Sequence, residues 1–214
     1  MNTVKILKTY ISEISVSEVS SLLNNKHSLK VAICNTNTVI RSYRDETLGK
    51  IINSFDIKTP DGFPIAKSSS ILYSNNQRRV DGYNVLLTTI REGLEKNTSH
   101  YFFGSEDYIL KKVIQNLEKD FPLINIVGSL SPPVTEFNEL TEEQYIQDIQ
   151  NVNPDIVWVS LGFPKQEMFI ELLQKKYRME SNFVGIGAVF EWVAGTKVKA
   201  PEFIANLGLE WLLR

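Results

Sequence analysis

The chain has 214 residues, and 43% of them are hydrophobic, which is enough for one large domain with a substantial core. Its formal net charge of −2 and its pI near 5.8 give no overall basic field, so the composition argues against nucleic acid as a partner. One cysteine excludes a disulfide within the chain, and no apolar stretch approaches the about 18 residues of a membrane-spanning helix. These limits favour a protein of the reducing cytoplasm.

Residue types that often carry metal or redox chemistry are scarce. Cys34 lies in the apolar run 31–34, which predicts a buried and unreactive thiol. His27 and His100 are far apart in the sequence, so we expect neither a zinc site nor an iron site. We expect both histidines at the surface or at a strand edge.

Apolar runs of strand length alternate with segments of helical period along the chain. Residues 4–15 alternate in polarity, which predicts an added strand, and a short helix is expected after it. The expected strands of the main sheet are residues 30–34, 55–59, 100–103, 124–127, 155–161 and 183–186. The expected helices are residues 16–23, 38–53, 62–72, 84–96, 106–119, 142–151 and 165–177, and residues 201–214 as a docking helix.

This order predicts an α/β fold, a Rossmann-like and mostly parallel sheet with helices on both faces. We expect a single domain over residues 1–214, in which residues 1–28 add a strand and a helix to a core of residues 29–214. Right-handed crossovers place the strand exits on one edge of such a sheet, where ligands bind. The loops at the strand exits are therefore expected to form the active site.

Polar residues and glycines occupy these predicted turns. Asn35, Asp61, Gly104 and Gly187 come after strands, and Arg79 lies in a loop before a helix. Each has an ordinary interpretation: Asn35 or Asp61 as a helix cap, Gly104 as a turn glycine, Arg79 as a solvated charge. Taken together, they suggest a phosphate-bearing ligand that undergoes acid-base chemistry.

The stretch LGFPKQEMFI, residues 161–170, joins a predicted strand to a predicted helix. The ordinary interpretation is a turn followed by a helix start, and the functional one is a cradle for an anion. Gly162 allows close backbone approach, and Pro164 presets the entry to the helix. Lys165 and Gln166 offer hydrogen-bond donors to a sugar or a diphosphate, and Glu167 either binds sugar hydroxyls or supports the first helical turn.

Several motifs resemble the WecG/TagA/CpsF family of bacterial glycosyltransferases, glycosyltransferase family 26. The most specific are PDIVWVSLGFPKQE at 154–167, GIGAVFEWVAG at 185–195, KAP at 199–201 and GLEW at 208–211. Earlier matches are PDG at 60–62, FFG at 102–104, DFP at 120–122 and IVG at 126–128. The resemblance implies an inverting, metal-independent and cofactor-independent enzyme. Such enzymes move a sugar from a UDP-sugar to a polyprenyl-diphosphate-linked glycan at the cytoplasmic membrane face, for teichoic acid, common antigen or capsule.

The resemblance also implies roles for individual residues. It makes Asp61 the general base and Arg79 a phosphate ligand, and it places Gln166 near the nucleotide sugar. Asn35 matches the asparagine that follows the first strand in the family. The remaining candidates for substrate binding are Gly104, Gly162, Pro164, Lys165, Glu167, Gly187, Glu191 and Lys199.

The sequence departs from the family pattern at four places. Ile33 replaces a threonine, residues 81–84 replace a Thr-Gly-x-Asp motif, Glu191 replaces an aspartate, and Lys199 replaces an arginine. These changes bear on the donor sugar, N-acetylmannosamine-type or hexose, and on the acceptor. They leave the reaction class intact, and Arg79 with Lys199 is expected to neutralise the departing UDP.

Two other functions stay open on the sequence. One is a nucleotide-sugar-binding module without turnover. The other is a Rossmann-type oxidoreductase, although no G-x-G-x-x-G motif follows the first strand, whose exit is CNTNT at 34–38. A homo-oligomer is also left open. The family normally continues beyond residue 214 into a basic region, and we therefore expect a peripheral protein at the inner membrane face with weak intrinsic membrane affinity.

Overall fold

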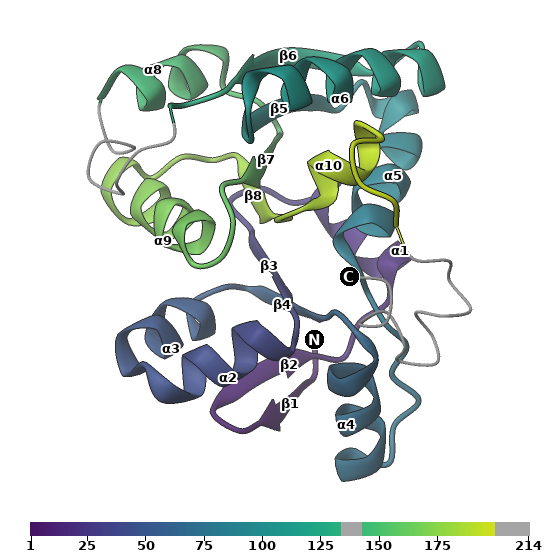
Figure 1. The fold of residues 1–214 in the computed structure, drawn as a ribbon, viewed down its shortest axis with the longest axis vertical. Helices are drawn as coiled ribbons and strands as arrows, with labels where there is room; N and C mark the ends of the chain where they lie inside the picture. The colour runs from purple at the N-terminus through teal and green to yellow at the C-terminus, as the bar shows by residue number, and fades with distance from the viewer. Residues whose placement is uncertain (134–142, 200–214) are drawn as a thin grey trace.

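The computed structural model of the chain describes residues 1–133 and 143–199. Six parallel strands form the central sheet in the order β4-β3-β8-β7-β5-β6 (Figure 1). Their bounds are β3 Lys30–Cys34, β4 Ile57–Pro60, β5 Ser99–Gly104, β6 Asn125–Leu130, β7 Ile156–Ser160 and β8 Asn182–Gly185. The predicted α/β fold with a Rossmann-like parallel sheet is confirmed.

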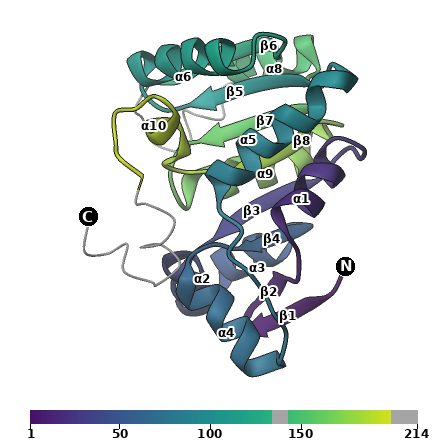
Figure 2. The ribbon, with the colours of Figure 1, turned by 90° about the vertical axis from the view of Figure 1, so that its right-hand side faces the viewer.

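Helices cover both faces of the sheet, as the sequence predicted. One apolar core joins the first face to helices α1 Val16–Leu23, α5 Gly82–Gly93, α6 Asp107–Asp120 and α10 Val189–Val193. A second core joins the other face to α2 Thr36–Arg44, α3 Glu46–Asn53, α4 Phe63–Tyr73, α8 Glu143–Val152 and α9 Lys165–Leu172. In Figure 2, α1 and α5 lie in front of the strands. A short 3-10 turn, Leu94–Lys96, follows α5, and a π-helical turn, Leu173–Tyr177, follows α9.

Burial on both faces explains why the strands are continuous apolar runs. In β7, Ile156 and Trp158 enter the first core, whereas Val157 and Val159 enter the second. Successive side chains of a strand point to opposite faces, so a strand between two helical layers needs apolar residues at every position.

Two predicted elements are wrong in their extent. The helix expected at residues 38–53 is two helices, because Asp45 adopts an extended conformation (φ −112°, ψ 110°) and its carboxylate accepts from Leu48 N–H at 3.0 Å. The strand expected near the N-terminus is an antiparallel hairpin, β1 Thr3–Ile6 and β2 Thr9–Ser12. The docking helix expected at residues 201–214 lies outside the described residues.

His100 is not a surface or edge residue as expected. Its side chain is 1% exposed on β5, next to β7, and Trp158 Nε1–H donates to its Nδ1 at 3.2 Å. Burial lowers the pKa of His100 to about 4, although Asp155 acts in the opposite direction. Cys34 is buried as predicted, and burial raises the pKa of its thiol.

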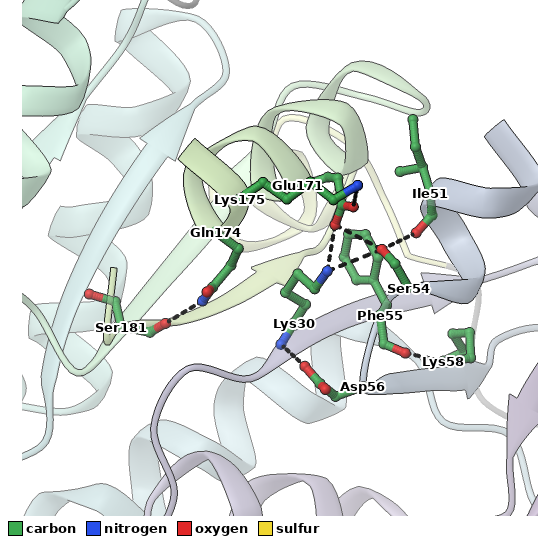
Figure 3. A network of polar contacts seen from close by, with 10 residues as sticks. All are labelled: Lys30, Ile51, Ser54, Phe55, Asp56, Lys58, Glu171, Gln174, Lys175 and Ser181. Atoms are coloured by element: carbon green, nitrogen blue, oxygen red, sulfur yellow. Dashed lines mark hydrogen bonds and ion pairs between the residues drawn. The ribbon is translucent and has the colours of Figure 1, made fainter. Parts of the chain in front are cut away.

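A buried ion pair ties the first strand of the sheet to α9 (Figure 3). Lys30 of β3 contacts the Glu171 carboxylate, which also accepts from Ser54 Oγ at 2.8 Å and pairs with Lys175 at 2.7 Å. The side chains of Lys30 and Glu171 are 12% and 7% exposed. Three partners around one carboxylate offset its desolvation, so α9 keeps a fixed position over β3.

The packing at the end of β5 explains why residue 104 is a glycine. The first prediction concerns its substitution. Its φ is +106°, and a Cβ would lie 2.4 Å from the Ser160 carbonyl oxygen. We expect Gly104→Ala to lower the free energy of unfolding by about 3 kcal/mol, through backbone strain and overlap together. Gly195 has a φ of +70° and, in the described part of the chain, no atom within 4 Å of such a Cβ. Gly195→Ala should cost only about 1 kcal/mol. Equal losses in urea denaturation would contradict the packing explanation.

Candidate active site

The carboxyl ends of β3, β4, β7 and β8 surround a cavity of about 710 Å³. From β3 the chain crosses to β4 on one side, while β8 and β7 lie on the other side. The cavity therefore lies where the strand order reverses, the usual ligand site of an open parallel sheet. Its lining residues are Ile33, Asn35, Thr38, Asp61, Gly82, Gly162, Phe163, Gln166, Glu167, Gly185, Ile186, Gly187, Ala188, Val189, Trp192, Lys197, Val198 and Lys199.

Helices α2 and α9 both begin at the cavity. Asn35 is the N-cap of α2, and its Oδ1 accepts from Thr38 N–H at 3.1 Å. The cap interpretation of Asn35 is thus confirmed, and the same residue lines the cavity. Gly162 precedes α9 with a φ of +76°, and a Cβ there would meet no atom within 4 Å in the described part of the chain. Both helices direct the positive ends of their dipoles at the cavity, which favours an anionic ligand.

Gln166 links the start of α9 to the turn after β8. Its Oε1 accepts from Gly187 N–H at 3.0 Å, and its Nε2 donates to Glu167 Oε1 at 2.8 Å. The amide is thereby held in one orientation at the cavity wall. Pro164 is the N-cap residue of α9, and neither it nor Lys165 is part of the cavity lining.

Glu167 is almost fully buried, at 1% exposure. Burial raises the pKa of its carboxyl group to about 7, and the hydrogen bond from Gln166 opposes this shift. Its Oε2 has no hydrogen-bond partner among the described residues. Of the two roles open on the sequence, this geometry favours support of the helix start over contact with sugar hydroxyls.

Asp61 and Arg79, eighteen residues apart, form an ion pair at the edge of the cavity. Arg79 Nε donates to Asp61 Oδ1 at 3.0 Å, and the side chains are 12% and 16% exposed for Arg79 and Asp61. The cap interpretation of Asp61 is wrong, because Gly62 is the N-cap residue of α4 and no described side chain makes a cap hydrogen bond there. The interpretation of Arg79 as a solvated charge is wrong as well. The pair holds the carboxylate in a fixed orientation.

Sequence reasoning missed a second ion pair, between Asp81 and Lys199. Asp81 caps α5, accepts from Asn84 N–H at 3.2 Å, and contacts Lys199 Nζ at 3.2 Å. Burial raises the pKa of Asp81, but the charges of Lys199 and Arg79 and the Asn84 hydrogen bond outweigh it, so the pKa lies below its ordinary value. The Asp-Gly dipeptide signals a cap, but no local pattern reveals a partner 118 residues away.

The other candidates lie around the cavity or beyond it. Glu191 of α10 pairs with Lys197 Nζ at 2.7 Å and is not part of the lining, and Gly104 packs against β7. Lys197 and Trp192 line the cavity without having been predicted. Trp192 stands in the motif at 185–195, which was the available signal.

Among residues 1–133 and 143–199, no three His, Cys, Asp or Glu side chains gather as metal ligands would. Within the same residues, no helix combines the length and the apolarity needed to cross a membrane.

The family model described as "Glycosyl transferase WecG/TagA/CpsF family" matches residues 4–214. The chain belongs to this family, and it is a glycosyltransferase. This finding argues against both alternatives, the Rossmann-type oxidoreductase and the nucleotide-sugar-binding module without turnover.

Similar proteins carry the name N-acetylglucosaminyldiphosphoundecaprenol N-acetyl-beta-D-mannosaminyltransferase. The Bacillus spizizenii protein is 27% identical over 206 residues, which are 95% of this chain and 76% of that protein. The Bacillus subtilis protein is 25% identical over 192 residues, 90% and 73% of the two chains. A Staphylococcus aureus protein is 22% identical over 201 residues, 93% and 77%.

The second prediction concerns Glu167 and pH. Because the folded protein binds the Glu167 proton more tightly than the unfolded chain, this group contributes stability at low pH that is lost as the pH rises from its ordinary pKa of 4.5 to about 7. Glutamine does not ionise. The free energy of unfolding of Glu167→Gln relative to wild type should therefore rise by about 3 kcal/mol between pH about 4.5 and about 8.

Denaturant titrations at both pH values provide the measurement. Glu118→Gln, at an exposed position of α6, is the matched control and should change the free energy of unfolding by no more than about 0.5 kcal/mol. A Glu167→Gln difference that stays the same at both pH values would show that Glu167 titrates as an ordinary glutamate.

Proposed function

We propose that the enzyme transfers an N-acetylmannosamine-type sugar or a hexose from a UDP-sugar to a polyprenyl-diphosphate-linked glycan. The reaction would take place at the cytoplasmic face of the membrane, in bacterial cell-surface polysaccharide synthesis. The names of the Bacillus and Staphylococcus relatives support the acceptor class. The observation that carries the proposal is an oriented carboxylate, Asp61, at a cavity toward which two helix N-termini point.

The proposed chemistry is a single displacement with inversion. The oxygen of an acceptor hydroxyl forms a bond to the anomeric carbon while the bond from that carbon to the UDP oxygen breaks. A neutral alcohol is a poor nucleophile near neutral pH, so a base must take its proton. Asp61 serves as that base, and the Arg79 contact keeps its carboxylate turned to one position.

The departing UDP carries the negative charge that the reaction develops. The N-termini of α2 and α9 face the cavity, and Lys199 contributes a cation to its wall. Preorganised dipoles and cations of this kind stabilise a developing anion without rearrangement during the reaction. The donor is therefore placed in the cavity with its diphosphate near these helix starts, and Gln166 borders it.

The third prediction tests Asp61 as the base. Asp61→Asn keeps an oxygen that accepts from Arg79 Nε, and because Gly62 caps the next helix, no cap is lost. We expect a nearly unchanged melting temperature, retained UDP binding, and a rate lower by between about 100-fold and about 10,000-fold.

Sugar transfer and UDP binding are measured on the same preparation. Asp120→Asn, at an exposed aspartate that ends α6, is the control and should turn over like wild type. Turnover by Asp61→Asn close to that of wild type would remove Asp61 from the mechanism and direct attention to Asp81 or Glu191.

The fourth prediction is metal independence. In the proposed mechanism, Lys199 and the helix N-termini compensate the charge of the leaving group. Transfer measured after dialysis against excess EDTA should therefore match the untreated enzyme. A complete loss of sugar transfer after dialysis, with activity restored by magnesium or manganese, would contradict this part of the proposal.

A further inference from the structure

A second, smaller groove of about 490 Å³ adjoins the main cavity. Lys199 lines both hollows, and the groove continues along Arg79 to the first turns of α4. Its wall includes Phe63 and Lys67 of α4, and Arg78. The groove is thus continuous with the site of the proposed base but lies on the side away from α9.

The charges of this groove are not balanced by its own residues. Its acid, Asp81, is held by Lys199 at 3.2 Å. Within residues 1–133 and 143–199, the side chains of Lys67 and Arg78 make no ion pair or hydrogen bond. Two exposed cations beside an already neutralised carboxylate create a site for an anion with more than one charge.

The groove side of α4 changes character along the helix. Phe63, Lys67 and Ile71 follow one another at a spacing of four residues, so they lie on one side of α4. Ile71 and its neighbour Leu72 are 67% and 64% exposed, which is unusual for large aliphatic side chains. Since a helix rises about 1.5 Å per residue, this apolar end begins about 6 Å beyond Lys67.

The groove and the helix therefore present three zones in order. Asp61 lies two residues before the start of α4, the cations Lys67 and Arg78 come next, and the exposed aliphatic residues come last. A polyprenyl-diphosphate-linked sugar has its reactive hydroxyl, its diphosphate and its hydrocarbon chain in the same order. Charge and hydrophobicity match this ligand along its length.

We propose that Lys67 and Arg78 bind the diphosphate of the acceptor and that its first isoprene units leave the protein over Ile71 and Leu72. This assignment rests on the proposed function. It separates the two substrates: the donor diphosphate lies at the starts of α2 and α9, and the acceptor diphosphate lies along α4. The acceptor sugar then reaches Asp61 from the α4 side.

The test uses a soluble acceptor without vesicles, N-acetylglucosamine diphosphate that carries a ten-carbon prenyl chain, with UDP-N-acetylmannosamine as the donor. The KM for the acceptor should rise about tenfold in Lys67→Ala or Arg78→Ala and about 100-fold in the double variant. The KM for the donor should stay unchanged, because these residues do not line the main cavity. The effect should weaken as salt is added.

A matched control removes two positive charges elsewhere. Lys112 and Lys119 are exposed on α6, which lies at the end of the molecule opposite α4 in Figures 1 and 2. Lys112→Ala/Lys119→Ala should leave both KM values at the wild-type level. Melting curves should coincide for all variants, because every changed side chain is exposed.

A second variant tests the hydrocarbon end. Ile71→Ser/Leu72→Ser should raise the KM for the prenyl acceptor several-fold. The KM for an acceptor that carries a methyl group in place of the prenyl chain should stay unchanged, because it has no hydrocarbon chain to bind these residues.

The outcomes separate the claims. Transfer by wild type with an unchanged acceptor KM in Lys67→Ala/Arg78→Ala overturns this inference and leaves the proposed function standing. A loss in that variant that occurs only with vesicles assigns the two cations to lipid headgroups and overturns it as well. If wild type transfers no sugar to the acceptor, either from UDP-N-acetylmannosamine or from UDP-hexoses tried in its place, the proposed function fails first.

Discussion

The parallel pairing of β3 with β8 is the contact on which the site depends. These strands come from opposite ends of the described chain, and their register sets Lys30 against Phe183 and Ala32 against Gly185. Asn182, with no exposed surface, secures the start of β8. Its amide accepts from Leu29 N–H at 3.0 Å and donates to the backbone carbonyls of Leu23 and Lys26 at 3.0 and 2.7 Å. A buried amide with all these bonds made fixes one register, since any slip would leave polar groups unsatisfied.

That register determines which turns face each other across the cavity. The turn after β3 carries Asn35, and the turn after β8 carries Gly187, whose N–H is held by Gln166 from α9. Three connections distant in sequence thus meet at one point, and each contributes backbone N–H groups or a helix start. The arrangement needs few charged side chains to attract an anion, because oriented backbone groups already supply part of the positive potential.

The sequence predicted those features that follow from local pattern. Apolar runs with helical segments between them gave the parallel sheet, and Asn35 after the first strand gave a cap at the sheet edge. The failures have tertiary causes. Histidine is a polar residue and was expected at the surface, but the side chain of His100 is buried and its Nδ1 accepts a hydrogen bond from the Trp158 indole. The ion pairs Asp61–Arg79 and Asp81–Lys199 join segments that are distant in the sequence, and no periodicity predicts such pairs. Asp61 was therefore interpreted as a helix cap, whereas its carboxylate binds Arg79.

Helix α9 carries two buried acids one turn apart, and their different surroundings explain how the first turn of the helix is held at the cavity. Glu171 is compensated by Lys30, Lys175 and Ser54, which anchors the helix where no ligand is expected. Glu167, at the cavity, has only Gln166 as a side-chain partner among the described residues. An uncompensated buried carboxyl group destabilises its surroundings, so the helix start would relax without a firm attachment further along. The ion pairs of Glu171 provide that attachment, and they allow the first turn of α9 to hold an amide in the orientation that the cavity wall requires.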